Sequence, residues 1–382
     1  MKTASDVFRI AMLGWCLAAS MLSPVTVMAV EFALVGPRAI GMGGAGVAVT
    51  TDALATYWNP AGLAMKQSVD FLIQGSVQGV DRFGFKDIID DIDAIDTNIV
   101  ANQTSLQALL DKLSTPGTSF SGIGAGGVYL KGYLGNHAFG VNISDVATGG
   151  MFAPRPMTAL ISGTSLVVDT PLDVQALEAR QAGFSYARAL AQRTVFVGAT
   201  VKVIQGAAYF NEVQVIGADG TIKFIDDLKK AEISTKVGVD VGAIYRPSSR
   251  IIIGVVGKDL NEPTFDAPGG REFKLNPQVR GGIAFKPYST LTLTFDGDVT
   301  SNKTLVPGVK SRVLSLGAEQ TLLSEVFSLR IGALKNVEDA KSIVTPTAGL
   351  GIRIFALRFD VGGGYDFRES GALVGFSMAM AF

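Results

Sequence analysis

The strongest constraint on the fold is an alternation of apolar residues with polar or small ones that recurs along the chain. Between residues 195 and 203 every odd position is Val or Ala, while the even positions include Gly, Thr and Lys202. The same pattern recurs at 236–245, 291–296 and 357–361. Because successive side chains of a β-strand point to opposite faces, each of these segments predicts a strand with one apolar and one polar face.

About 14 such segments occur, close in length to the roughly 9–11 residues with which a tilted strand crosses a bilayer. Long connections such as 81–120 and 149–179 alternate with tight turns such as Leu134-Gly135, although the last hairpin, at 369–370, is short on the side of the long loops. An even strand number, long outer loops and short periplasmic turns are typical of bacterial outer-membrane barrels. We therefore predict an all-β fold, a transmembrane antiparallel β-barrel. Its strands are expected at 68–80, 121–133, 136–148, 180–191, 194–208, 232–246, 249–261, 277–287, 290–300, 311–322, 325–336, 344–355, 357–368 and 371–382.

The first 29 residues have the layout of an export signal. Lys2 and Arg9 precede an apolar run, and Val27-Met28-Ala29 provides the small residue that signal peptidase requires before its cleavage site. Residues 1–29, including Cys16, are therefore expected to be removed. After Ala29 no stretch of roughly 18 apolar residues recurs, which argues against a helical membrane protein. Export and alternating strands together predict the outer membrane of a Gram-negative bacterium.

Composition excludes several classes of function. Charged residues make up 18% of the chain, and 33 basic side chains nearly balance 34 acidic ones. No basic field is therefore available to hold nucleic acid. The single His, His137, lies in a tight turn, and the mature chain would contain no Cys. Catalysis by a Cys–His or Ser–His pair, a metal site and a cofactor are accordingly not expected, and neither is an enzyme.

The last predicted strand carries an apolar stripe that runs to the final residue. Small or polar residues separate its members, which are Val374, Phe376, Met378, Met380 and Phe382. A terminal Phe on such a strand resembles the signal that the outer-membrane barrel-assembly machinery reads. We expect the stripe from Phe376 to Phe382 to face outer-membrane lipid and to direct assembly.

A glycine-rich segment precedes the first predicted strand. Gly41, Gly43 and Gly46 match the G-x-G-x-x-G spacing of dinucleotide-binding turns. That fingerprint requires a strand before it and a helix after it, whereas only a short leader precedes this one. Pro60 also biases Asn59 away from helical conformation. A nucleotide site is therefore not predicted.

The same segment carries a family resemblance. Its G-x-x-x-x-G-M-G-G-A run, followed by Y-x-N-P-A-G-L from Tyr57, resembles the start of outer-membrane barrels of the FadL type. Further pieces, among them N-P-Q-V-R-G-G at 276–282, resemble the TraF-like branch, named after plasmid conjugal-transfer genes. The resemblance implies that residues 30–67 form a hatch inside the lumen of a barrel formed by 68–382. The hatch motif would comprise Gly41, Gly43, Gly44, Asn59, Pro60 and Ala61.

Two functions of different classes follow from this resemblance. The first is hatch-gated passage of small hydrophobic or amphipathic molecules, with a hydrophobic ligand as the partner. The second is a sealed structural or assembly component of an envelope machine, such as a conjugal transfer apparatus, with envelope or conjugation proteins as partners. The family's motifs are mostly structural, so the resemblance implies the fold more strongly than either function.

The inward positions of the predicted strands carry mixed charges, unlike the greasy ligand channel of fatty-acid transporters. These charges are either ion pairs that fill the lumen or a path for polar solutes. Arg280, Arg330 and Arg353 are further expected to donate hydrogen bonds to hatch carbonyls that water cannot reach. The full set comprises Lys202, Asp240, Arg280, Asp296, Asp298, Glu319, Arg330, Arg353, Arg358 and Asp360.

The first long loop, 81–120, contains the one helical pattern. Apolar residues recur at spacings of three or four within 87–113, and aspartates occupy the other face at its start. The aspartates lack the Gly and Glu that an EF-hand requires, so a calcium site is not predicted. We expect an amphipathic helix over the outer mouth of the barrel, or, as the alternative, a surface that captures apolar ligands.

Overall fold

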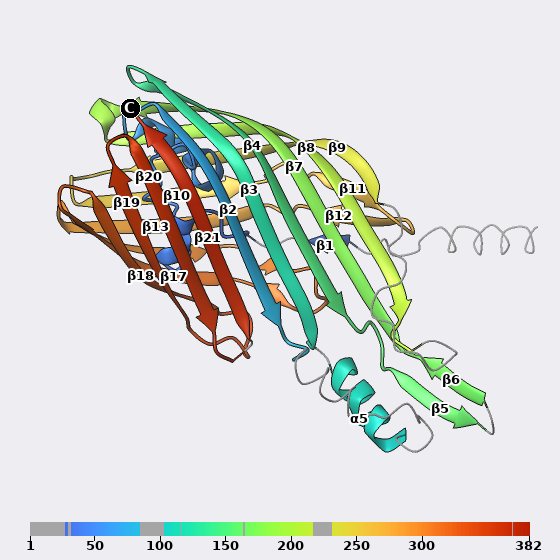
Figure 1. The fold of residues 1–382 in the computed structure, drawn as a ribbon. Helices are drawn as coiled ribbons and strands as arrows, with labels where there is room; N and C mark the ends of the chain where they lie inside the picture. Colours follow the sequence, from blue (N-terminus) through green and yellow to red (C-terminus); the bar gives the residue numbers. More distant parts are fainter. Residues whose placement is uncertain are drawn as a thin grey trace, which may run out of the picture.

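The computed structural model describes residues 27–29, 32–84, 103–115, 117–162, 165–216, 231–368 and 370–382. Fourteen of the strands close into a single antiparallel barrel, as predicted, and β2 and β21 complete the ring with Phe71 opposite Met380 (Figure 1). No helix among these residues is long and apolar enough to cross a membrane. The barrel strands are β2 (Asp70–Asp81), β3 (Ser119–Leu134), β4 (His137–Phe152), β7 (Pro171–Leu190), β8 (Val195–Gln214), β9 (Glu232–Tyr245), β10 (Ile251–Lys258), β13 (Gln278–Tyr288), β14 (Leu291–Asp298), β17 (Val313–Leu322), β18 (Phe327–Asn336), β19 (Thr345–Ile354), β20 (Leu357–Asp366) and β21 (Gly371–Ala381).

The barrel wall is taller on one side, where four consecutive strands extend far beyond the others (Figure 1). β3 and β4 have 16 residues each and β7 and β8 have 20 each, against 10 in β17 to β20. The predicted strand at 180–191 therefore began nine residues too late, and the one at 194–208 ended six residues too early. On the outer surface Glu178 and Arg180 form an ion pair of 2.6 Å, which ends the apolar alternation while the backbone ladder continues.

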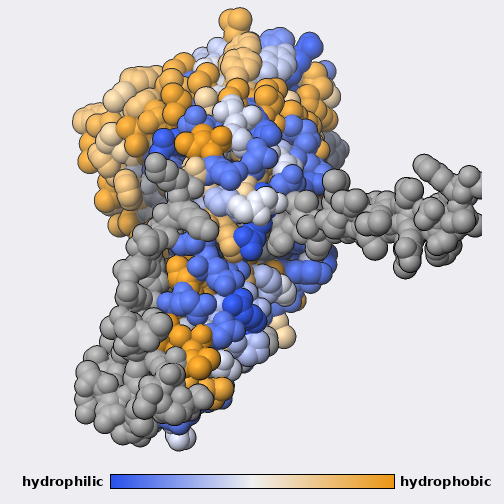
Figure 2. Space-filling model, turned by 90° about the vertical axis from the view of Figure 1, so that its right-hand side faces the viewer, coloured by the Kyte–Doolittle hydropathy of each residue, from blue (hydrophilic) through white to orange (hydrophobic). Residues whose placement is uncertain are grey.

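The outward face of the barrel near the short turns is apolar. Exposed side chains on this face include Val197, Val201, Phe285, Leu316 and Phe376. Hydrophobic residues cover much of the upper half of the molecule in Figure 2, whereas hydrophilic residues dominate the lower half, which carries the long loops. This distribution is what a strand barrel requires of the part that contacts lipid.

Residues 32–68, called the inner segment below, lie inside the barrel (Figure 1). They contain α2 (Pro37–Gly41), α3 (Ala55–Trp58) and the 3-10 helix η1 (Pro60–Ala64). Nearly every side chain in this stretch is buried. The chain leaves the inner segment at Val69, whose N–H and C=O pair with the backbone of Phe382.

Two of the long loops fold inward. The hairpin of β11 (Thr264–Ala267) and β12 (Arg271–Lys274) packs against β8 and β9, with Phe265 and Phe273 fully buried. A short strand, β1 (Val27–Ala29), pairs in parallel with β12. The second loop contains β15 (Asn302–Lys303) and β16 (Lys310–Ser311) and buries Leu305 and Val306.

The remaining elements lie beyond the tall wall. Of the helix predicted within 87–113, the described part is α5 (Gln103–Ser114); residues 85–102, with most of the aspartates, lie outside the described residues. The apolar face of α5 is buried in a cluster with Met157 and Ala159, beside the hairpin of β5 (Thr158–Ser162) and β6 (Ser165–Asp169) (Figure 1). That face is therefore a packing surface and offers no exposed apolar site. A further 3-10 turn, η2 (Ala191–Arg193), joins β7 to β8.

Candidate functional site: the inner segment and the lumen

The inner segment rests against the barrel wall through glycines on both surfaces. A Cβ on Gly43, whose φ is +66°, would lie 2.4 Å from the carbonyl oxygen of Ala333 in β18. A Cβ on Gly41 would lie 2.9 Å from the Cα of Gly349 in β19, and one on Gly349 would lie 3.1 Å from the Cα of Gly41. Only glycine allows backbones to approach this closely, which explains why the motif glycines face wall positions that also lack side chains.

Side chains of the wall supply hydrogen bonds to the backbone of the inner segment. Oδ2 of Asp296 in β14 accepts the N–H groups of Gly46 (2.7 Å) and Val47 (2.8 Å). Oγ1 of Thr347 in β19 accepts the N–H of Gly43 (2.9 Å) and donates to the carbonyl of Gly41 (3.2 Å). These bonds satisfy backbone groups that have little regular secondary structure to pair them.

Asn59, Pro60 and Ala61 lie against β8, β9 and β10. Oδ1 of Asn59 accepts the N–H of Ala61 at 3.1 Å and so caps η1, while its Nδ2 donates to Val47 O at 3.1 Å. The same Nδ2 also lies 3.4 Å and 3.3 Å from carbonyl oxygens of β9 and β10. A Cβ on Gly198 of β8 would lie 2.6 Å from the carbonyl carbon of Pro60. The motif thus ends the inner segment in a fixed turn before β2.

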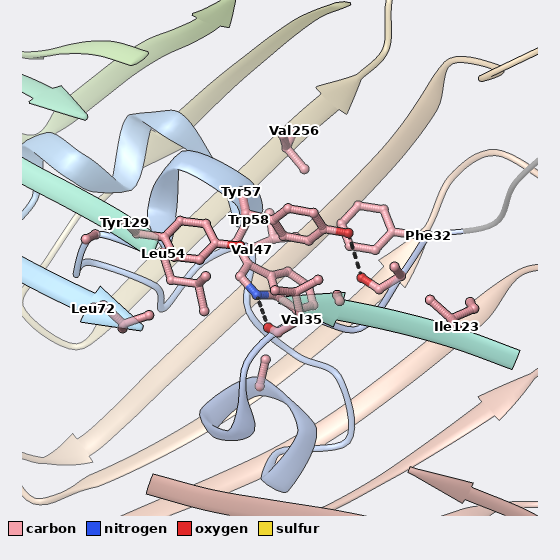
Figure 3. Close-up of a cluster of buried hydrophobic side chains, with 14 residues drawn as sticks. Phe32, Val35, Val47, Leu54, Tyr57, Trp58, Leu72, Ile123, Tyr129 and Val256 are labelled. Atoms are coloured by element: carbon pink, nitrogen blue, oxygen red, sulfur yellow. Dashed lines mark hydrogen bonds between the residues drawn. The ribbon is translucent and has the colours of Figure 1, made fainter. Parts of the chain in front are cut away.

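An aromatic cluster forms the centre of the inner segment (Figure 3). The ring centroids of Phe32 and Trp58 are 5.3 Å apart, and Tyr57 meets both rings edge-on or near edge-on at 6.1 Å. Tyr57 donates its hydroxyl to Ala33 O (2.9 Å) and Trp58 donates Nε1 to Val35 O (2.8 Å). Burial raises the pKa of Tyr57 well above its ordinary value, so the hydroxyl remains a donor. Nζ of Lys258 lies 3.2 Å from the Tyr57 ring centre.

The largest ion-pair network joins the inner segment to three wall strands. Arg38 of α2 meets Glu319 of β17 through two nitrogens, at 2.7 and 2.9 Å, and also donates to Val49 O at 3.0 Å. Glu319 in turn accepts Nε of Arg330 at 2.7 Å, and Nη1 of Arg330 lies 2.8 Å from Asp360. Burial alone would lower the pKa of Arg38, but Glu319 outweighs it and raises that pKa above its ordinary value.

Two further networks lie on the lumen side of the wall. Arg280 of β13 pairs with Asp298 at 3.2 Å, lies 4.0 Å from Asp296, and donates to Gly44 O at 3.0 Å. Lys202 of β8 lies 2.9 Å from Asp240 and 2.8 Å from Asp259, which follows β10. All of these side chains are buried, so the charges pair with one another rather than line an open aqueous path.

The structure corrects one sequence expectation about the arginines. Only Arg280, of the three expected to bond hatch carbonyls, does so. Arg330 is taken up by two carboxylates, and Arg353 lies at the rim, 33% exposed, where it pairs with Glu325 at 2.7 Å. Arg358 pairs with Asp360 at 2.7 Å. A guanidinium beside a carboxylate makes the stronger, charge-assisted bond, and a nearby carbonyl does not displace it.

Cavities lie on both sides of the inner segment. On the side of the long loops, a cavity of about 130 Å³ has Leu34 of the inner segment in its lining, with Ile123, Leu305 and Leu373. Beyond it, a larger space of about 780 Å³ includes Phe210 in its lining. On the side of the short turns, two cavities of about 270 and 230 Å³ share Arg38, Thr51, Lys66, Lys286 and Thr292. The lining of the outer cavity also includes polar side chains such as Gln78, Thr148 and Asp366, so the inner segment separates an outer cavity of mixed lining from more polar inner ones.

Sequence reasoning missed two cations of this site. Lys286 continues the inward series of Arg280, Gly282 and Ala284 by two residues, so the alternation itself was a usable signal. Arg38 stands within the glycine-rich segment, where no periodicity indicates which side chain meets the wall. The partner of Arg38, Glu319, by contrast, follows the inward alternation of β17 and is among the charges expected to face the lumen.

The terminal apolar stripe lies on the outer surface of β21. Phe376, Met378 and Phe382 are exposed, and Met380 is partly covered by its strand neighbours Phe71 and Leu357. The stripe is thus available for contact with lipid or with another protein.

Comparison with known proteins agrees with this architecture. The family model described as "F plasmid transfer operon, TraF, protein" matches residues 56–298, more than half of the chain. No curated protein matches the sequence. Among solved structures, the CymD monoaromatic hydrocarbon channel is 13% identical, with a TM-score of 0.57, over 92% of this chain and 97% of that one. The toluene transporter TbuX of Ralstonia pickettii is 17% identical (TM-score 0.56; 91% and 97% covered).

A FadL homologue of Pseudomonas aeruginosa is 12% identical, with a TM-score of 0.56, over 92% of this chain and 99% of that one. At such identities the structural likeness concerns the fold, which confirms the FadL-type barrel that the sequence resembles. The match to the family model places the chain in the TraF branch of this fold. The chain therefore belongs to the family of the F plasmid transfer operon protein TraF, built on the fold of FadL-type outer-membrane barrels.

Proposed function

We propose that this protein passes small hydrophobic or amphipathic molecules across the outer membrane of a Gram-negative bacterium, with the inner segment as the gate. One observation carries the proposal: a buried segment divides the lumen into an outer cavity, whose lining mixes aliphatic and polar side chains, and more polar inner cavities. Its contacts with the wall are backbone approaches at glycines, hydrogen bonds from side chains and the ion pair of Arg38 with Glu319. Such contacts can be exchanged without breaking the strand ladder of the barrel.

The named neighbours support the same class of cargo. One is called a monoaromatic hydrocarbon channel and another a toluene transporter. The outer cavity of this chain has aliphatic side chains beside polar ones in its lining, which suits a small apolar or amphipathic molecule. The proposal also includes three further points. The protein is exported with cleavage after Ala29, it is inserted by the barrel-assembly machinery, and its role is not enzymatic.

The proposed gating role can be tested by removing hydrogen bonds between the wall and the inner segment. Asp296→Ala removes the acceptor of two N–H groups of the inner segment, where a hydrogen bond to a charged group contributes roughly 1.5–3 kcal/mol. We expect more frequent channel openings in planar bilayers, and larger openings when residues 36–58 are deleted. Asp366→Ala is the matched control, because Asp366 is also buried in the wall, where it accepts hydrogen bonds from the Thr345 hydroxyl and the Arg368 N–H, both outside the inner segment.

The alternative, a sealed component of a conjugation apparatus, predicts a different outcome. In a sealed scaffold the deletion would chiefly destabilise the barrel, because it leaves inward charges such as Glu319 short of a partner. A deletion variant that folds, migrates as a heat-modifiable barrel and stays electrically silent would contradict the proposed gate.

A further inference from the structure

The cavity of about 230 Å³ on the short-turn side has an unusual charge distribution. Four cationic side chains contribute to its lining: Arg38 and Lys66 from the inner segment, Arg246 from the end of β9, and Lys286 from β13. No carboxylate belongs to this lining within the part of the chain that the structure describes. The side chains that line this cavity therefore carry a net positive charge.

Among the described residues, a carboxylate pairs with only one of these four cations, Arg38. Arg38 is paired with Glu319, but Arg246 donates to the carbonyl of Arg193 at 2.9 Å and lies 5.2 Å from the Phe196 ring centre. The side chains of Lys66 and Lys286 make no hydrogen bond or ion pair with any described residue. Lys286 is only partly exposed, so it holds a charge in a confined space without a protein partner.

The adjoining cavity of about 270 Å³ has a nearly balanced lining, with five cationic and four carboxylate side chains. It shares Lys66 and Lys286, and three of its four carboxylates are paired with other cations. Asp70 lies 3.4 Å from Lys131, Glu325 pairs with Arg353, and Glu319 holds two arginines. Only Asp52 in that lining has no cationic partner, and its Oδ1 accepts the N–H of Leu54 at 3.1 Å.

We propose that the short-turn-side cavity binds an oxyanion, a carboxylate or a phosphate, with Lys286 as its principal ligand. The two free ammonium groups and the Arg246 guanidinium supply the charge, and the hydroxyls of Thr51, Ser249 and Thr292 border the same space. In a cavity partly shielded from solvent these attractions are stronger than in bulk water. The anion is either the headgroup of an amphipathic molecule or a free anion of the periplasm.

The site goes beyond the proposed passage and can be tested without it. The protein is purified at full mature length and placed in nanodiscs of neutral lipid, and inorganic phosphate and octyl phosphate are titrated by calorimetry. Lys286→Gln should weaken binding roughly tenfold or more, which corresponds to about 1.4 kcal/mol. Lys341→Gln, the same charge change at an exposed outer loop, should leave the affinity unchanged. Lys66→Gln should also weaken binding.

The two probes separate the sources of the anion. Binding of inorganic phosphate that Lys286→Gln weakens identifies a free-anion site, and binding of octyl phosphate alone, with the same sensitivity, identifies a headgroup site. Equal affinities in Lys286→Gln and Lys341→Gln, in barrels with unchanged heat-modifiable migration, would overturn the proposal. Failure of both probes to bind the wild-type protein would overturn it too. If bilayer recordings show no gate while Lys286-dependent binding persists, the proposed function fails and the anion site stands.

Discussion

At the residue scale, two kinds of contact hold the inner segment: glycines that allow close approach and arginines that pair with buried carboxylates. For each kind of contact, the same chain contains a residue of the same type that does not make the contact. Gly43 and Gly270 share a positive φ, of +66° and +70°, but only Gly43 faces a wall. Arg330 and Arg353 occupy consecutive strands, but only Arg330 is buried. These pairs allow each contribution to be measured against its own control.

Gly43→Ala should destabilise the seating of the inner segment. The new Cβ would lie 2.4 Å from a backbone carbonyl that cannot move aside, in addition to the cost of about 1–2 kcal/mol for an L-residue at positive φ. Gly270→Ala introduces only the backbone strain of positive φ and no steric clash, because nothing lies within 4 Å of its Cβ. Thermal loss of heat-resistant migration should therefore occur at a lower temperature for Gly43→Ala. Equal shifts for the two variants would mean that the inner segment does not press on β18.

Arg330→Met should be far more costly than Arg353→Met. The first change leaves each of the buried carboxylates Glu319 and Asp360 with one arginine fewer, and breaking a buried ion pair typically costs about 3–5 kcal/mol. The second removes a pair that is 33% and 59% exposed, for which about 0–1 kcal/mol is usual. Denaturant unfolding in detergent measures both. Similar losses would place Arg353, contrary to the structure, in the buried network.

At the element scale, β21 combines two tasks, since its inner face closes the barrel and its outer face carries the apolar stripe. Small or polar residues such as Gly375 and Ser377 face the lumen, while Phe376 and Met378 face outward. The last residue is paired through its backbone with Val69, so the side chain of Phe382 is free for recognition at 75% exposure. The strand therefore remains regular whatever the final side chain is.

Phe382→Ser should reduce assembly rather than stability. If the terminal stripe is what the assembly machinery reads, less heat-modifiable barrel accumulates in the outer membrane, although the purified variant unfolds like the wild type. Phe355→Ser is the control, because Phe355 is 97% exposed in a short turn between β19 and β20. Normal accumulation of Phe382→Ser would show that the stripe serves only lipid contact.

At the scale of the whole molecule, the barrel could be predicted from local pattern. Alternation with a period of two is a property of each strand by itself, and long loops alternating with tight turns set the direction of every hairpin. The predicted strands therefore agree with the structure near the short turns. They fail at the outer ends of β7 and β8, where the ladder continues beyond lipid and the outward residues are no longer required to be apolar.

The interior of the barrel depended on long-range contacts that no local pattern encodes. Alternation indicated that Arg280, Arg330 and Asp296 point inward, but not that Asp296 holds the backbone of Gly46 or that Arg330 prefers two carboxylates to a carbonyl. The partners of these charges are separated in sequence by up to some 280 residues, as with Arg38 and Glu319. Choice among buried charges is governed by distance and desolvation, and both exist only once the barrel has closed around the inner segment.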